Sequence, residues 1–409
     1  MHLDGLSIVE TLKNDSIKQK IITLFIDKGA LPIADITKEI GLSVPTVTKI
    51  LGELKDINLV SPVEKTKETR TWNATLYNLN PKAGYFIGVD IKHNKVIITR
   101  TDFLGNQISC ENYKDFDLWG NPDALNHLHQ MIEDFIDRLE VPKSEILAVG
   151  FSMPGRINSA KGISYNFFYD PAKPFAQAMS DKLEIPVYID NDTRCIGYAE
   201  YLLGPSKGKK NVVYVNMSWG IGVALIFNRQ IYYGKSGFSG EYGHISVFDN
   251  EILCVCGKKG CLETETSGLA IHRKFIKALD EGSCSIITNS IKDKSKISLN
   301  DIIDAAKNED VLAIDIIQGV ASQLGKYLAG ILNLLNPNVL ILGGSIGVMG
   351  DYVSFAVKSA LMKYSLNYVN NDTDVITAEI GDAGGALGAC LITRSKLLGL
   401  INLEEEQED

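Results

Sequence analysis

Apolar and polar positions follow two different patterns along this chain, and the change falls near residue 80. Up to that point apolar residues repeat at helical spacing and predict a helix over residues 16–28 that ends at Gly29. A second, short helix is expected over residues 32–41, and Ser43 is placed to cap a third. Two short helices joined by a turn at residues 41–43 have helix-turn-helix geometry.

The third predicted helix has two distinct faces. Its apolar stripe consists of Val47, Ile50, Leu51 and Leu54. The opposite face carries small or basic residues that can reach base edges and phosphates in a DNA major groove: Pro45, Thr46, Thr48, Lys49 and Lys55, with Ser43 at the start of the helix. We therefore expect this helix to read DNA.

An alternating pattern after Val60 predicts a two-stranded hairpin, a wing, with Lys65, Lys67 and Arg70 near its tip. One copy of such a module binds DNA weakly, so a dimer that reads two half-sites is implied. Residues 1–80 hold ten basic and ten acidic side chains, which leaves a three-helix interaction module as the alternative. Basic groups on one helix face and at the wing tip would still contact phosphates.

From residue 85 onward, short apolar runs of strand length alternate with helical segments. The clearest strands are expected at residues 85–91, 95–101, 148–153, 185–189, 211–218, 222–227 and 338–342. This order implies an α/β protein with two subdomains after the DNA-binding segment. The predicted domains are residues 1–80, then 85–205 plus 386–402, and then 206–385.

Three of the seven cysteines lie within eight positions, and a histidine precedes the first of them by ten residues. Thiolate and imidazole groups at this spacing are typical of a closed, tetrahedral, structural Zn²⁺ site. We expect one zinc ion per chain, held by His244, Cys254, Cys256 and Cys261. The alternative is three buried cysteines beside an unrelated histidine. The acids Glu241 and Glu263 flank the cluster and are not needed for the metal, so they are free to meet a substrate.

Composition limits the possible classes of protein. Of the 409 residues 45% are hydrophobic and 22% charged, as in a soluble globular protein. The chain lacks an apolar run of about 18 residues and a signal-peptide pattern, so a cytoplasmic protein without a membrane partner is expected. The net charge of −9 argues against a generally basic nucleic-acid binder, although five of the negative charges lie in the tail at residues 404–409.

The remaining cysteines carry no pattern of their own. An odd, modest cysteine count fits a reducing compartment rather than a disulfide framework. Cys110, Cys195, Cys284 and Cys390 are therefore expected to be small residues of the core.

The stretches Gly-Glu-Tyr-Gly-His at residues 240–244 and Cys-Val-Cys-Gly-Lys-Lys-Gly-Cys-Leu-Glu at 254–263 resemble the motif of the ROK family of bacterial sugar kinases and sugar-responsive repressors. They match every fixed position of that motif, and the resemblance runs from about residue 85 to 400. It implies a two-subdomain actin-like (ribonuclease H-like) ATPase and sugar-kinase fold with a sugar cleft between the subdomains. The N-terminal segment looks like the winged helix-turn-helix of the repressor branch.

The resemblance also implies sugar-binding residues. Family members carry Glu-Asn-Asp-Ala-Asn where this chain has Asp-Asn-Asp-Thr-Arg at residues 190–194. The sugar-binding amide and the catalytic base of the family correspond to Asn191 and Asp192, and Arg194 stands in place of an asparagine. Three further residues are expected beside the sugar: Glu241, His244 and Glu263. A polar turn or helix cap is the alternative for residues 190–192.

The first phosphate-binding turn departs from the kinases of the family. They carry Asp-x-Gly-Gly-Thr, in which two glycines present backbone N–H groups to phosphate. Here the turn reads Asp-Ile-Lys-His-Asn at residues 90–94, and Lys92, His93 and Asn94 replace both glycines and the threonine. We therefore expect the ATP site to be lost.

The combined expectation is a non-catalytic, sugar-responsive regulator that represses carbohydrate-utilisation genes. Its partners would be operator DNA, a small sugar or sugar derivative as effector, and its own copies in a homodimer or homotetramer. Two alternatives stay open. One is an ATP-dependent hexose kinase with Asp192 as general base, and the other is a sugar sensor that binds a partner protein.

Overall fold

A computed structural model of the chain describes residues 12, 15–63, 74–114, 116–118, 121 and 123–401. Contacts divide the chain into two compact units. The first unit comprises Met1–Leu202, Lys235–Gly237 and Asp382–Asp409, and the second comprises Leu203–Gly234 and Phe238–Gly381. The predicted division into three domains stays a prediction. Within the described residues, every helix is too short or too polar to cross a membrane.

The N-terminal part of the first unit is a winged helix-turn-helix. Its helices are α2 (Ser16–Lys28), α3 (Ile33–Ile40) and α4 (Val44–Asp56), which confirms the three predicted helices. Its sheet has the order β1-β3-β2, with β1 at Leu31–Pro32, β2 at Val60–Pro62 and β3 at Leu76–Leu79. The predicted hairpin is therefore present, and β1 is an additional strand.

Local sequence sets the ends of the two short helices. Gly41 ends α3 in the left-handed region at φ 73°, where glycine has no Cβ to clash. The Ser43 side chain then accepts the Thr46 N–H at 3.4 Å and caps α4. Lys18 of α2 lies 2.9 Å from Glu53 of α4, which joins the first and third helices across the module.

One hydrophobic core runs from the winged helix-turn-helix into the body of the first unit. It combines the buried faces of α2 and α4 with Phe86, Phe103, Leu147 and Leu397 of the body. The connection between the two parts is packed equally closely, because a Cβ at Gly84 would lie 2.5 Å from the Leu147 side chain. The DNA-binding module and the body are thus joined by packing as well as by the chain.

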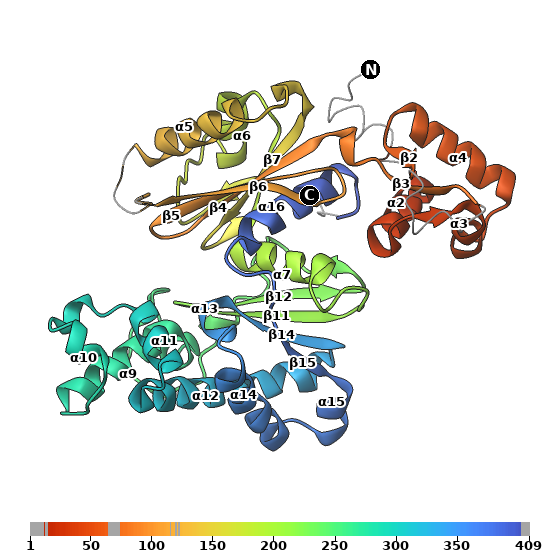
Figure 1. Cartoon of the computed structure of the whole chain (residues 1–409). Helices are drawn as coiled ribbons and strands as arrows, with labels where there is room; N and C mark the ends of the chain where they lie inside the picture. Colours follow the sequence, from red (N-terminus) through yellow and green to blue (C-terminus); the bar gives the residue numbers. More distant parts are fainter. Residues whose placement is uncertain are drawn as a thin grey trace. The chain divides into compact units, whose positions relative to one another are not determined.

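The body of the first unit is a five-stranded sheet of order β10-β7-β4-β5-β6. These strands span Val187–Asn191, Ile146–Met153, Tyr85–Ile91, Lys95–Thr101 and Gln107–Lys114. The helices α5 (Ala124–Asp137) and α6 (Phe175–Leu183) cover one face, and α16 (Gly384–Leu397) covers the other (Figure 1). A small hairpin, β8 (Ile157–Asn158) and β9 (Ile163–Ser164), follows β7, and α7 (Asp192–Leu203) follows β10.

Glycines allow α16 to lie directly on the sheet. A Cβ at Gly88 of β4 would come within 1.9 Å of the Ala386 carbonyl oxygen, and one at Gly150 of β7 within 2.5 Å of the Ala389 carbonyl oxygen. Side chains at either position would lift the helix off the strands.

The second unit also contains a five-stranded sheet, of order β13-β12-β11-β14-β15. Its strands span Gln230–Ile231, Ile221–Phe227, Val212–Met217, Val339–Gly343 and Asp374–Thr377. Its helices are α8 (Glu263–Thr266), α9 (Gly268–Asp280), α10 (Ile287–Ser290), α11 (Leu299–Lys307), α12 (Val311–Leu335), α13 (Gly344–Gly347), α14 (Asp351–Tyr364) and α15 (Asn367–Asp372). A single apolar cluster joins this sheet to α9, α11, α12 and α14.

The prediction for the four remaining cysteines is half wrong. Cys195 and Cys390 are buried as expected, but Cys110 and Cys284 are exposed. Cys110 lies on the outermost strand, β6, where alternate side chains face solvent. Cys284 lies in an exposed loop after the end of α9.

Candidate effector and metal sites

The predicted metal ligands converge in the second unit. His244 ends the short 3₁₀ helix Tyr242–His244, and the three cysteines lie on the loop that precedes α8. One donor atom from each of His244, Cys254, Cys256 and Cys261 lies within 4.8 Å of all the others. Cys254 Sγ is 3.5 Å from His244 Nδ1, and Cys256 Sγ is 3.6 Å from Cys261 Sγ. Since all three cysteines are free thiols, the group fits a tetrahedral site for a soft cation.

Backbone turns hold these four donors together. Gly257 and Gly260 adopt φ values of 82° and 75°, which side-chain-bearing residues rarely accept. A Cβ at Gly260 would also lie 2.3 Å from the Phe248 carbonyl oxygen, so the loop is closely packed at this point. The fold therefore brings the donors together through the geometry of the chain itself.

Burial affects the chemistry of the thiols. It raises the pKa of both Cys254 and Cys261, because a thiolate in this loop loses its contact with water. Thiolates of this kind are stable only when a cation compensates their charge, and Zn²⁺ does so by replacing the thiol protons.

The two acids beside the cluster lie in different environments. Glu241 is exposed, and its carboxylate is 3.6 Å from His244 Nε2. Glu263 is buried, and its Oε2 accepts the Ile221 N–H at 3.0 Å. The other oxygen of Glu263 lies 3.7 Å from Cys254 Sγ. Glu263 therefore connects the cysteine loop to the start of β12, a structural role that the sequence did not indicate.

The predicted sugar-binding pair of the first unit lies at the end of β10. The strand continues through Asn191, and α7 begins at Asp192, so no separate turn intervenes. The Asn191 side chain donates to the Gly155 carbonyl oxygen at 3.0 Å, which holds it beside the Pro-Gly turn after β7. Asp192 Oδ1 accepts the Thr193 N–H at 2.7 Å, so Oδ2 is the oxygen that can receive a ligand hydroxyl.

The carboxyl group of Asp192 has an unusual affinity for protons. Burial raises its pKa to about 6, and the nearby carboxylate of Asp90 adds to the shift. The backbone N–H of Thr193 opposes this shift by stabilising the anion. Asp192 can therefore change its charge near neutral pH, which few carboxyl groups do.

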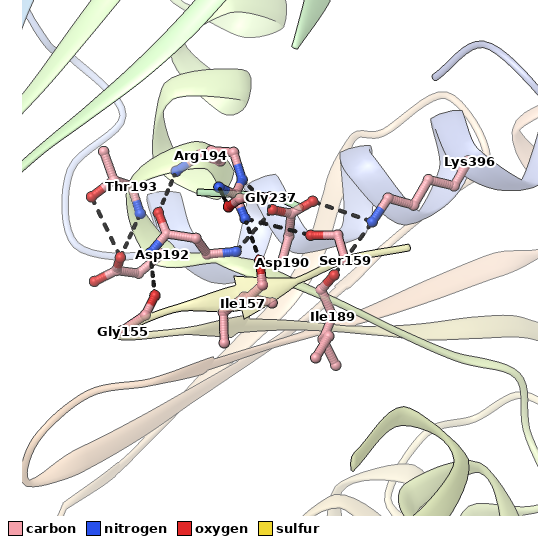
Figure 2. A network of polar contacts seen from close by, with 11 residues as sticks. Gly155, Ile157, Ser159, Ile189, Asp190, Asp192, Thr193, Arg194, Gly237 and Lys396 are labelled. Atoms are coloured by element: carbon pink, nitrogen blue, oxygen red, sulfur yellow. Dashed lines mark hydrogen bonds and ion pairs between the residues drawn. The ribbon is translucent and has the colours of Figure 1, made fainter. Parts of the chain in front are cut away.

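Asp190 and Arg194, the sequence neighbours of this pair, take part in a buried polar network (Figure 2). Asp190 Oδ1 accepts a hydrogen bond from Arg194 Nε at 2.6 Å, and Asp190 Oδ2 accepts one from Lys396 Nζ at 3.2 Å. All three side chains are at most 4% exposed. The sequence pattern singled out Asp190 and Arg194, but it gave no sign of Lys396, which comes from α16.

At the turn that corresponds to the first phosphate-binding turn of the kinases, lysine and aspartate side chains of the protein pair with one another. Lys92 Nζ lies 3.5 Å from the buried Asp90 carboxylate and 2.6 Å from Asp382, and Lys95 also reaches Asp382. Asp382 comes just before α16, and its carboxyl pKa is lowered by the two lysines despite partial burial. A Cβ at Gly385 would clash with the Asp90 carboxylate at 2.3 Å, so this corner is densely packed.

The predicted DNA-contacting residues of α4 lie on its outer side. Ser43, Pro45, Thr46, Thr48 and Lys49 are all exposed, whereas Val47 and Ile50 of the same helix are buried. The predicted wing residues Lys65, Lys67 and Arg70 lie outside the described residues. Within the described residues, the predicted DNA contacts therefore all lie at the exposed face of α4.

Together, the winged helix-turn-helix and the two-sheet body define a DNA-binding protein with a sugar-kinase-like fold. The chain belongs to the ROK family, whose model matches residues 86–396, and a winged helix-turn-helix DNA-binding model matches residues 14–61. These matches confirm the predicted family and fold class.

Known proteins with this arrangement resemble the chain over nearly its whole length. It is 29% identical over 395 residues to the xylose repressor of Bacillus spizizenii, covering 95% of this chain and 97% of that protein. It is 26% identical over 382 residues to the N-acetylglucosamine repressor of Escherichia coli O157:H7, covering 91% of each. A solved ROK family transcriptional regulator, a homolog of the E. coli Mlc protein, superposes with a TM-score of 0.78 at 25% identity, covering 97% and 98% of the two chains.

Proposed function

We propose that this protein is a transcriptional repressor whose affinity for operator DNA is set by a small sugar. One observation carries the proposal: an exposed helix α4 in a winged helix-turn-helix is joined to a sugar-kinase-like body whose phosphate turn is filled by Lys92 and Asp382. A kinase does not need a DNA-binding helix, and a phosphate turn that is already filled by Lys92 and Asp382 would not accept the phosphates of ATP. The similarity to the xylose and N-acetylglucosamine repressors supports a role in carbohydrate metabolism.

The sugar would bind through hydroxyl groups. In the proposed site Asn191 and Asp192 of the first unit hydrogen-bond the sugar, together with Glu241, Glu263 and His244 of the second unit. Carboxylate and amide groups are suited to this role because they can accept or donate in a directed way to neighbouring hydroxyls. Asp192 then serves as an acceptor for the ligand, and no phosphoryl transfer follows.

Zinc has a structural role in this proposal. His244, Cys254, Cys256 and Cys261 would hold one Zn²⁺, with His244 Nδ1 as the ligand because it is the ring nitrogen that faces Cys254. The ion would supply a fixed four-coordinate centre for the loop. His244 Nε2 would then face Glu241 and orient its carboxylate, as outer partners of metal-bound histidines do.

The DNA-binding form would be a homodimer or a homotetramer. Two copies of α4 would read half-sites about 34 Å apart, so a change in the arrangement of the subunits alters operator affinity. A sugar produces this change only if it binds the DNA-competent and DNA-incompetent forms with different affinities.

The test begins with operator fragments selected from a random-sequence DNA pool with the full-length protein. Operator affinity is then measured at fixed salt with and without D-xylose, D-glucose and N-acetyl-D-glucosamine. We expect one of these sugars to weaken operator binding at least tenfold. The Glu241→Ala variant should keep its DNA affinity and lose this response.

Two outcomes would contradict the proposal. If every sugar leaves operator affinity within twofold, the sugar does not regulate DNA binding. If the protein releases ADP from ATP in a sugar-dependent reaction that Asp192→Ala abolishes, the protein is a kinase.

A further inference from the structure

Three residues of the chain belong to a different unit from their neighbours in sequence. Lys235–Gly237 packs with the first unit, whereas the chain before and after it belongs to the second unit. Gly237 is buried at φ 82°, and a Cβ there would lie 2.5 Å from the Ile157 carbonyl oxygen of β8. This crossing segment is therefore held closely against the hairpin that follows β7.

Arg194 fixes the crossing segment to the effector end of the first unit (Figure 2). Its Nη1 donates to the Gly237 carbonyl oxygen at 2.8 Å, and its Nη2 donates to the Ile157 carbonyl oxygen at 3.3 Å. Its Nε donates to Asp190 at 2.6 Å. A guanidinium group is the one side chain that can reach three separate acceptors in a fixed plane, so a single residue positions strand, hairpin and crossing segment.

The network keeps Arg194 charged and in place. Asp190 Oδ1 accepts both Arg194 Nε and the Asn191 N–H, the latter at 2.8 Å, and Oδ2 accepts Lys396. The guanidinium does not lose its proton in proteins, and a buried charge of this kind is stable only with its partners. Arg194 also contacts the proposed effector residue directly, since its N–H donates to Asn191 Oδ1 at 3.3 Å.

The crossing segment leads immediately to Glu241. After Gly237 the Ser239 N–H donates to the Tyr233 carbonyl oxygen at 3.0 Å, and the Gly240 carbonyl oxygen accepts the Val223 N–H at 3.2 Å. A Cβ at Gly240 would lie 1.9 Å from the Val223 carbonyl oxygen, so this second point has little freedom. Three residue steps span at most about 11 Å, so a segment held at both Gly237 and Gly240 has few conformations open to it before Glu241.

We propose that Arg194 is a positioning residue for the effector site: it contacts Asn191 directly and, by holding Gly237, restricts the segment that leads to Glu241. The inference rests on the proposed function, because it assigns a role in binding the same sugar. It also gives a reason for the departure of this chain from the family pattern at residue 194. An asparagine amide, with its shorter reach and two N–H donors, cannot replace the guanidinium in these three contacts.

The test compares Arg194→Lys with the wild-type protein. Lysine keeps the positive charge beside Asp190 but offers a single ammonium that cannot also reach Gly237 and Ile157. We expect hydrogen exchange in the peptide covering residues 232–241 to become at least tenfold faster. Affinity for whichever of the three sugars binds the wild-type protein should fall at least tenfold, while operator affinity without sugar stays within twofold.

Two further variants separate positioning from general damage. Gly237→Ala disturbs the same contact from the other side, by placing a Cβ against the Ile157 carbonyl oxygen, and should reproduce both effects. Arg138→Lys makes the same chemical change at an exposed arginine that pairs with Glu111, and should change neither quantity.

The exchange measurement requires no sugar, so it distinguishes failure of this inference from failure of the proposed function. Unchanged exchange over residues 232–241 in Arg194→Lys would overturn the inference. Faster exchange with sugar affinity within twofold of wild type would also overturn it, because the segment would then move without consequence for the site. If none of the sugars binds the wild-type protein, the proposed function fails and the exchange result still decides whether Arg194 holds the segment.

Discussion

The ammonium group of Lys92 lies 2.6 Å from a carboxylate oxygen of Asp382, although 290 residues separate the two in the chain. The same ammonium donates to the Asp382 carbonyl oxygen at 2.9 Å and faces the buried carboxylate of Asp90 at 3.5 Å. A basic side chain in a phosphate-binding turn would ordinarily attract an anion. Here its charge is already compensated by the protein.

Removal of Lys92 should destabilise the first unit. In Lys92→Ala the buried Asp90 and the nearby Asp382 lose their shared counter-charge, and we expect a loss of about 1–2 kcal/mol. This is less than for a fully buried pair, because the Lys92 side chain is 29% exposed. Denaturant unfolding of the full-length protein measures the effect. The Lys92→Ala/Asp382→Ala double variant should lose less stability than the sum of the single variants, and strict additivity would show that the pair is not coupled.

Sugar binding should depend on pH through Asp192. The carboxylate accepts a hydroxyl hydrogen much more strongly than the protonated acid does, and with a pKa of about 6 the ionised fraction falls from nearly all at pH 7.5 to about a quarter at pH 5.5. Apparent sugar affinity should therefore fall about fourfold over this range, as isothermal calorimetry can measure. Asp192→Asn should bind weakly at both pH values, and if it keeps the wild-type pH dependence then another group is responsible.

The raised pKa of Asp192 also determines the direction in which the free energy of unfolding changes with pH. The pKa of Asp192 is higher in the folded protein than the value of about 3.9 expected in the unfolded chain, so the folded state binds this proton more tightly. The contribution of this group to stability is thus greatest below about pH 4 and is lost as the pH rises through about 6. Asp192→Asn should remove this decline from a pH series of unfolding free energies, and an unchanged series would contradict the assignment.

One equivalent of zinc should accompany each chain after gentle purification. Cys256→Ser should reduce the zinc content to a small fraction and lower the melting temperature of the second unit by about 6–12 °C, since a bound structural ion contributes about 3 kcal/mol or more. Mass spectrometry for metals and calorimetry measure the two effects. Cys284→Ser provides the matched control, because Cys284 is an exposed thiol outside the cluster. Less than half an equivalent of zinc in the wild-type protein would contradict the metal assignment.

Lys49 should contribute to DNA binding through charge. It is exposed on the outer face of α4, and loss of one phosphate contact in Lys49→Ala should reduce the slope of log affinity against log salt by about 1. Sugar affinity should be unchanged. Lys277→Ala removes the same charge from an exposed position on α9 and should leave the slope as it is. Equal slopes for Lys49→Ala and the wild-type protein would exclude a phosphate contact at this residue.

Features set by neighbouring residues were predictable from the sequence. The helix at Ser16–Lys28 and the strand at Tyr85–Ile91 have the predicted ends, because caps and apolar periodicity are local properties. The four zinc-type donors were predictable for a similar reason, since all four lie in one short stretch of the chain between residues 244 and 261. Strand β1, at Leu31–Pro32, was missed because two residues form a strand only when a partner such as Tyr77 is already in place.

Features that depend on distant contacts were not predictable. The sequence does not indicate that Lys396 lies beside Asp190 or that Asp382 lies beside Lys92. Both residues reach these positions because α16 and the residues just before it pack there from the far end of the chain. The exposure of Cys110 likewise depends on its place in an outermost strand, which residue type does not encode. The role of Glu263 as acceptor for the Ile221 N–H also became visible only in the folded loop.

The shared core of the winged helix-turn-helix and the body has a consequence for modularity. Phe103 and Leu147 of the body lie in the same apolar core as helices α2 and α4, so the winged helix-turn-helix cut out by itself would expose apolar surface to water. It should therefore melt together with the body in one cooperative transition. A chimera that carries the winged helix-turn-helix of a different regulator would also need that regulator's residues around Leu147. The helix-turn-helix is packed against the body and is not an independent domain on a flexible linker.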